Sequence, residues 1–136
     1  MGARLERALR GDRGEVTAEL VIVIPVLFLA LMAIIQFVLW SHATHVAQAA
    51  TAQALAAART QDGTAGTGHA AGQQLLEDLA RGPLQNPQLT VSRGPTAVSV
   101  AVQGEAAAVV PGLHLHVHAE AAGAVERFVP DIPGAR

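Results

Sequence analysis

The sequence predicts an α+β protein: a long N-terminal transmembrane helix that continues outside the membrane, then a small domain with a short helix and about three antiparallel strands. Three observations predict it. The stretch from Leu20 to Trp40 is apolar except for one clearly polar side chain, Gln36. Alanine-rich sequence without glycine or proline follows to residue 59. Farther on, from residue 89, apolar side chains recur at every second position, which is the period of a strand.

The apolar stretch is long enough to cross a membrane. As a helix, residues 20–40 extend roughly 31 Å, about the thickness of the hydrocarbon core. Four arginines precede the stretch, whereas the next basic residue after it is Arg59. Because basic residues near a span stay in the cytoplasm, we expect a single-pass cell membrane protein with a cytoplasmic N-terminus and an extracytoplasmic C-terminal domain. Residues 1–14 form a cytoplasmic leader that we expect to be too short and polar to fold.

Helical character does not stop at the membrane, so the predicted long helix covers residues 15–60. Alanine, the best helix former, dominates residues 41–59. The alanines at spacings of three or four would lie on one face of the helix: Ala43, Ala47, Ala50, Ala54 and Ala58. Such a stripe of small side chains lets another helix approach closely. Alternatively, the alanines reflect only a GC-rich coding sequence.

A glycine-rich segment, residues 61–68, predicts a flexible linker before a small domain over residues 69–129. The first element of that domain would be a helix over residues 69–81, ended by Gly82-Pro83. A domain of this size has a weak core, so we expect it to be stabilised by the long helix or by neighbouring subunits.

Strands are predicted after a turn around Asn86-Pro87. The alternating runs near residues 89–93 and 98–103 would pair as a β-hairpin through Gly94-Pro95. A third strand would begin at Leu113 and extend to about Glu126, after a turn at Pro111-Gly112. Residues 130–136 are expected to form a disordered tail.

Three histidines would share one face of the third strand: His114, His116 and His118. Three imidazoles are able to bind zinc, but neighbouring positions on one strand face are about 6.6–7 Å apart and do not converge on one ion. We therefore expect a solvated histidine face and no metal site, and the sequence assigns these side chains no role.

Composition argues against several other functions. The formal net charge of −2 gives no reason to expect nucleic-acid binding, and the chain has no cysteine for disulfides or thiolate chemistry. Residues 41–136 contain few acidic residues, no G-x-S-x-G sequence and no phosphate-binding loop. We expect neither an enzyme nor a bound cofactor.

Gly14, Glu19 and Pro25 form a pattern: a glycine after an arginine-rich leader, a glutamate five residues later and a proline six residues after that, inside the span. In this pattern the chain resembles the TadE-like proteins, pseudopilin-type components of tight-adherence (Flp-type) pilus systems. The alanine-rich helix resembles the same family. So do the C-terminal segments VSVAVQG, VVPGL and Val125-Glu126-Arg127-Phe128.

The resemblance implies that a prepilin peptidase cuts between Gly14 and Glu15, where glycine leaves the backbone accessible. The Glu19 carboxylate would then pair with the new α-ammonium group of a neighbouring subunit at the membrane boundary. Pro25 removes one helix hydrogen bond within the span. The implied partners are the membrane, the peptidase, other TadE-like or pilin subunits and the pilus assembly platform.

The implied function is that of a pseudopilin or minor pilin, a non-catalytic component of pilus assembly or of a related secretion machine. Two alternatives remain from the sequence. One is a secreted domain released by signal peptidase after Ala49, since Ala47-Gln48-Ala49 is a small-x-small site. The other is a simple membrane-anchored binding module. The position of the cut distinguishes the three.

Overall fold

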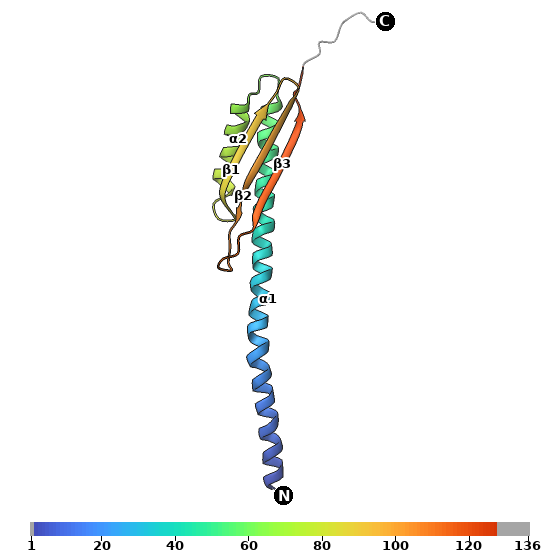
Figure 1. The fold of residues 1–136 in the computed structure, drawn as a ribbon, viewed down its shortest axis with the longest axis vertical. Coiled ribbons are helices and arrows are strands. Elements are labelled where there is room, and N and C mark those ends of the chain that lie inside the picture. Colours follow the sequence, from blue (N-terminus) through green and yellow to red (C-terminus); the bar gives the residue numbers. More distant parts are fainter. Residues whose placement is uncertain (1, 128–136) are drawn as a thin grey trace, which may run out of the picture. The chain divides into compact units, whose positions relative to one another are not determined.

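The structure, a computed structural model, describes residues 2–127 of the chain (Figure 1). Its elements are, in order, α1 (Gly2–Arg59), α2 (Ala65–Leu79), β1 (Leu84–Arg93), β2 (Ala97–Ala106) and β3 (His116–Ala124). The predicted α+β class is confirmed. The chain divides into two compact units, residues 1–35 and 36–136; the described part of the second, residues 36–127, is called the C-terminal domain below. The predicted disordered tail, 130–136, lies outside the described residues.

The first helix begins earlier than the sequence led us to expect. α1 starts at Gly2, so the leader, predicted to lack structure, is helical. The leader contains good helix formers, among them Ala3, Leu5, Ala8 and Leu9. Nucleation is the costly step in helix formation, and each residue added to an existing helix costs little. The strong helix downstream therefore explains the extension.

The second helix also begins earlier, inside the predicted linker. Thr64 is its N-cap: the Thr64 hydroxyl accepts a hydrogen bond from the Thr67 amide at 3.0 Å, and the Thr67 hydroxyl accepts one from the Thr64 amide at 2.8 Å. This reciprocal capping box satisfies two backbone donors at the helix start. The prediction of a linker through residue 68 was wrong because the cap and the packing described below outweigh the poor helix propensity of glycine.

The three strands form one antiparallel sheet in the order β1-β2-β3. The predicted hairpin through Gly94-Pro95 is confirmed, with Val91 opposite Val100. The predicted turn at Asn86-Pro87 is instead an irregularity within β1: the register with β2 shifts between Gln85 and Gln88, and Asn86 has a φ of 49°. Such a bulge lets a proline lie inside an edge strand.

The third strand is shorter than predicted, because it begins at His116 and not at Leu113. Its first partner is Glu105, near the end of β2. Pro111 and Gly112 form the centre of a turn in which the Leu113 amide donates to the Val110 carbonyl at 3.2 Å, and Gly112 has a φ of +80°. These are features of a type II turn.

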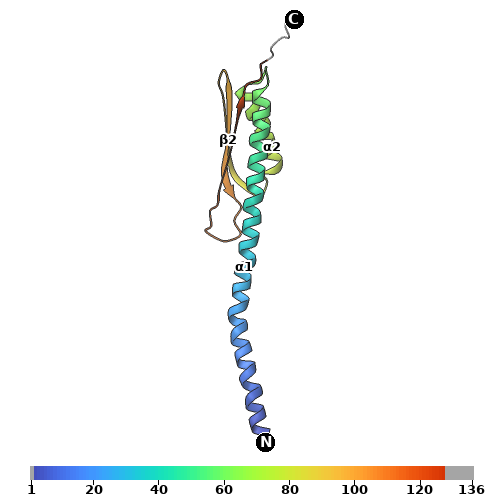
Figure 2. The same ribbon diagram turned by 90° about the vertical axis from the view of Figure 1, so that its right-hand side faces the viewer.

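Both helices of the C-terminal domain lie on one side of the sheet (Figure 2), and α2 packs against both α1 and β1. Alternate residues of β2 are buried there, as the period-two pattern predicted: Val98, Val100 and Val102. The five alanines of the predicted stripe have no exposed surface at all. The long helix therefore supplies much of the core of the C-terminal domain, as the size of that domain led us to expect.

Candidate functional site

The membrane-facing part of α1 is the first part of the candidate site. Among the described residues, one helix is long and apolar enough to cross a membrane, Val16–Arg59. Nearly all large apolar side chains between Val16 and Trp40 are exposed, including Leu29 and Phe37. Exposed apolar surface of this extent needs lipid or other protein around it, because water does not solvate it favourably. These features fit a single-pass membrane protein.

The four residues predicted to govern processing and assembly all lie in α1. The structure describes the helical backbone of Gly14 and Glu15. Glu19 is exposed at the start of the apolar stretch, one turn after Glu15. Pro25 is exposed inside the helix, which continues past it. The roles predicted for these residues stay predictions, but an exposed Glu19 is accessible to a partner.

The alanine stripe is occupied within the chain itself. Gly68 and Gly72 of α2 are buried against it. A Cβ atom on Gly68 would lie 2.6 Å from the Ala58 Cβ and 2.8 Å from the Ala54 carbonyl oxygen. The prediction that this stripe lets a helix approach closely is confirmed, and that helix is α2. The five alanines of the stripe are therefore not free for lateral packing against other subunits.

The second part of the candidate site is a clamp around Gln36, which is only 3% exposed. Its side-chain amide donates to the Ala107 carbonyl at 3.1 Å, and its side-chain oxygen accepts from the Val109 amide at 2.8 Å. One turn later, the Trp40 indole N–H donates to the His116 carbonyl at 3.3 Å. The one clearly polar side chain of the predicted span thus holds the segment between β2 and β3.

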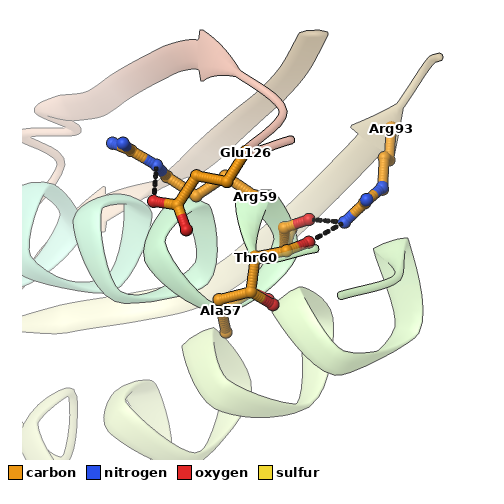
Figure 3. A network of polar contacts seen from close by, with 6 residues as sticks. Ala57, Arg59, Thr60, Arg93 and Glu126 are labelled. Carbon is orange, nitrogen blue, oxygen red and sulfur yellow. Dashed lines mark hydrogen bonds and ion pairs between the residues drawn. The ribbon is translucent and has the colours of Figure 1, made fainter. Parts of the chain in front are cut away.

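A third set of contacts ties the end of α1 to the sheet (Figure 3). The Arg93 guanidinium donates to the carbonyls of Ala58 and Thr60, the latter at 2.9 Å, and so satisfies acceptors that a helix C-terminus leaves free. Arg59 forms an ion pair with Glu126 at 3.0 Å, and the Glu126 amide donates to the Arg59 carbonyl at 2.8 Å. Both side chains of the ion pair are about half exposed, so it contributes about 1 kcal/mol at most.

These contacts give the C-terminal sequence pattern a structural meaning. The Val125 amide donates to the Thr96 carbonyl at 3.0 Å, and the Arg127 guanidinium donates to the Pro95 carbonyl at 3.0 Å. The segment Val125-Glu126-Arg127 therefore closes the sheet onto the end of α1. Phe128, the last residue of that pattern, lies outside the described residues. The sequence did not lead us to predict the contacts of Arg93 with the end of α1. The available signal was a charged residue at an inward position of a strand.

The histidines are only partly arranged as predicted. His114 lies before β3 and so does not share a strand face with the other two, because β3 starts at His116. The imidazoles of His114 and His116 lie 3.5 and 3.9 Å from the Glu105 carboxylate, and that of His118 lies 3.2 Å from Glu120. All three are exposed. In the part of the chain that the structure describes, no group of three or more His, Cys, Asp or Glu side chains is placed to hold a metal ion.

The family model described as TadE-like protein matches residues 14–56. The matched segment runs from Gly14 through Glu19 and Pro25 into the alanine stripe, so the resemblance seen in the sequence is confirmed there. No curated protein and no solved structure matches the chain.

Proposed function

We propose that this chain, which matches the TadE-like family model over residues 14–56, is a component of a tight-adherence pilus system and acts as a pseudopilin or minor pilin with no reaction of its own. Its N-terminus lies in the cytoplasm, α1 spans the membrane and the C-terminal domain lies outside. A prepilin peptidase cuts after Gly14. Glu19 then pairs with the new α-ammonium group of a neighbouring TadE-like or pilin subunit, or of a component of the assembly platform.

One observation supports this proposal most: within the matched segment, nearly all large apolar side chains from Val16 to Trp40 are exposed, whereas the alanines of the stripe that follows are buried in the chain's own domain. The surface left for lateral contact is thus the membrane-spanning part of α1, where Glu19 lies. The domain offers little for chemistry. Within residues 16–127 the buried polar or charged side chains are Gln36 and Thr51, neither of which is a typical catalytic acid, base or nucleophile in this setting.

The fold argues against release of a secreted domain after Ala49. Such a cut would remove Ala43, Val46 and Ala47 from the hydrophobic core of the C-terminal domain, together with the Gln36 clamp. Losing several packed core side chains costs about 2–5 kcal/mol for each large one and somewhat less for alanine, which a domain of this size does not withstand. The membrane-anchored module without assembly remains the alternative to test.

The mature N-terminus tests the proposal directly. We expect intact mass measurement of the protein from its native membrane to show a chain that starts at Glu15. The substitution Gly14→Val should leave the full-length chain uncut, because a β-branched side chain blocks backbone access at the cleavage point. Gly11→Val, in the same leader, is the matched control and should be processed normally. An uncut wild-type protein would support the anchored module, and a start near Ala50 would support secretion.

Glu19 tests assembly separately from processing. We expect Glu19→Gln to be cut and inserted like the wild type but to be lost from crosslinked complexes with pilin-type subunits. Removing one member of a buried ion pair costs about 3–5 kcal/mol, so recovery in complexes should fall more than tenfold. Ala18→Ser, at the neighbouring exposed position, keeps both members of the predicted pair and should behave like the wild type. Equal recovery of both variants would contradict a role for Glu19 in assembly.

A further inference from the structure

The segment between β2 and β3, residues 107–113, is called the apolar loop here because it reads AAVVPGL. It is fixed at several points of its backbone. Gln36 clamps Ala107 and Val109. The Ala107 amide donates to the Pro83 carbonyl at 2.9 Å, and the Leu113 amide closes the turn onto Val110. The apolar loop is therefore an ordered part of the C-terminal domain and presents a defined surface.

That surface has no charged side chain. Val109 and Leu113 are each more than one-third exposed, and Pro111 and Gly112 at the turn are exposed as well. In the same domain, Phe37 and Val38 of α1 are about 60% exposed, at 64% and 58%. Apolar loop tips in water normally contain polar residues, so a tip of this composition, on an ordered backbone, needs an apolar environment.

The hydrogen bonds fix the depth of the apolar loop along α1. Gln36 lies one helical turn before Trp40. The loop backbone that Gln36 binds is therefore about 6 Å closer to the centre of the bilayer than the Trp40 backbone. Trp side chains are favoured at the membrane interface, and residues 36–40 are the outer end of the predicted span. The loop backbone therefore lies at the level of the boundary between headgroups and acyl chains.

At that depth water is scarce, and backbone polar groups need partners within the protein. Gln36 supplies a donor to one carbonyl and an acceptor to one amide. Pro111 has no amide to satisfy, and the Leu113 amide donates to the Val110 carbonyl. A side-chain amide provides both functions without a charge, which explains a glutamine at this point of an otherwise apolar stretch.

We propose that the apolar loop, together with Phe37 and Val38, inserts into the bilayer leaflet on the side of the C-terminal domain, so that the domain rests on phospholipid. The occupant of this surface is thus the upper acyl-chain region of the lipid and not a protein partner. This inference rests on the membrane anchoring in the proposed function, but not on cleavage or pilus assembly.

Because the chain has no cysteine, single cysteines are available as label sites. The full-length protein is reconstituted at one copy per lipid nanodisc and labelled with the polarity-sensitive dye NBD at Val109→Cys or Leu113→Cys. Leu29→Cys in the span is the positive control, and Thr90→Cys on the exposed face of the sheet is the negative control. Phospholipids with a doxyl quencher near the headgroup end or the far end of the acyl chain report depth.

We expect the Val109 and Leu113 labels to emit at shorter wavelength than the Thr90 label, and to be quenched more by the headgroup-proximal doxyl group than by the distal one. Labels that behave like Thr90 while Leu29 is quenched would overturn loop insertion and leave the anchoring intact. If Leu29 also escapes quenching, the anchoring itself is wrong. A wavelength shift that requires several copies per disc would mean that a second chain covers the loop, and would also overturn the proposal.

Discussion

The substitution Gly68→Leu is expected to destabilise the C-terminal domain by about 3 kcal/mol, the upper end of the usual cost of overpacking. Even a Cβ atom at this position would lie 2.6 Å from the Ala58 Cβ and 2.8 Å from a backbone oxygen of Ala54. These neighbours belong to α1 and have little freedom to move. Circular dichroism of the full-length protein in detergent should show a midpoint lower by roughly 15 °C.

Substitutions at two other glycines of α2 give a comparison for the destabilisation expected from Gly68→Leu. A Cβ on Gly72 would meet the terminal Cδ2 of Leu89 at 2.7 Å and the Ala54 Cβ at 2.9 Å. Because the Leu89 methyl group is able to rotate away, Gly72→Leu should cost less than Gly68→Leu. Gly66 has only the Thr64 hydroxyl within 4 Å, at 3.5 Å, so Gly66→Leu should be neutral or stabilise the helix by up to about 1 kcal/mol. Equal midpoints for all three variants would contradict close packing of α2 on α1.

This ranking also shows where sequence reasoning succeeds and where it stops. The alanine stripe was readable because helical periodicity is local: spacings of three and four place Ala43 to Ala58 on one face whatever packs against them. The identity of the packing partner was not readable. Judged by propensity alone, Gly68 was assigned to a linker, and only close contact with α1 makes its missing side chain an advantage.

For the strands, too, local periodicity was readable from the sequence and the contacts between distant segments were not. The alternation of Val98, Val100 and Val102 predicted a half-buried strand, since period two has one structural meaning. The start of β3 was misplaced because the run from Leu113 to Val117 alternates too, although β2 ends at Ala106 and pairs no farther than His116. Strand ends depend on the length of the partner strand and on the turn between them, which periodicity does not encode.

Side chains that join distant segments were the hardest to predict. The sequence marked Gln36 as the one clearly polar residue of the span, but its partners lie 71 and 73 positions away. Arg93 lies at the end of the first predicted strand and was assigned no role, whereas its guanidinium binds the carbonyls of Ala58 and Thr60 at the end of α1. In both cases the residue type was informative, because a polar group in an apolar pattern needs a partner. The partner itself required the fold.

The second large effect is expected from Gln36→Leu. The change makes the span more apolar, so membrane insertion should be at least as favourable as in the wild type. It also removes a side-chain amide that is itself 3% exposed and leaves the Ala107 carbonyl and the Val109 amide without that partner. Each unsatisfied buried group costs about 1–3 kcal/mol. At about 2 kcal/mol, opening of the apolar loop becomes about thirtyfold more frequent, and hydrogen exchange of a peptide covering residues 107–113 should speed up accordingly.

Gln48→Leu is the matched control, because Gln48 lies on the same helix and its side chain is exposed. The control should leave exchange of the apolar loop unchanged. The comparison separates two explanations of a glutamine in a membrane span. If Gln36 were merely tolerated there, its replacement by leucine would stabilise the protein and leave exchange unaltered. If it is the clamp that the geometry indicates, the more apolar protein is the less stable one, and the loss is confined to the loop and to the neighbouring start of β3, where Trp40 binds His116.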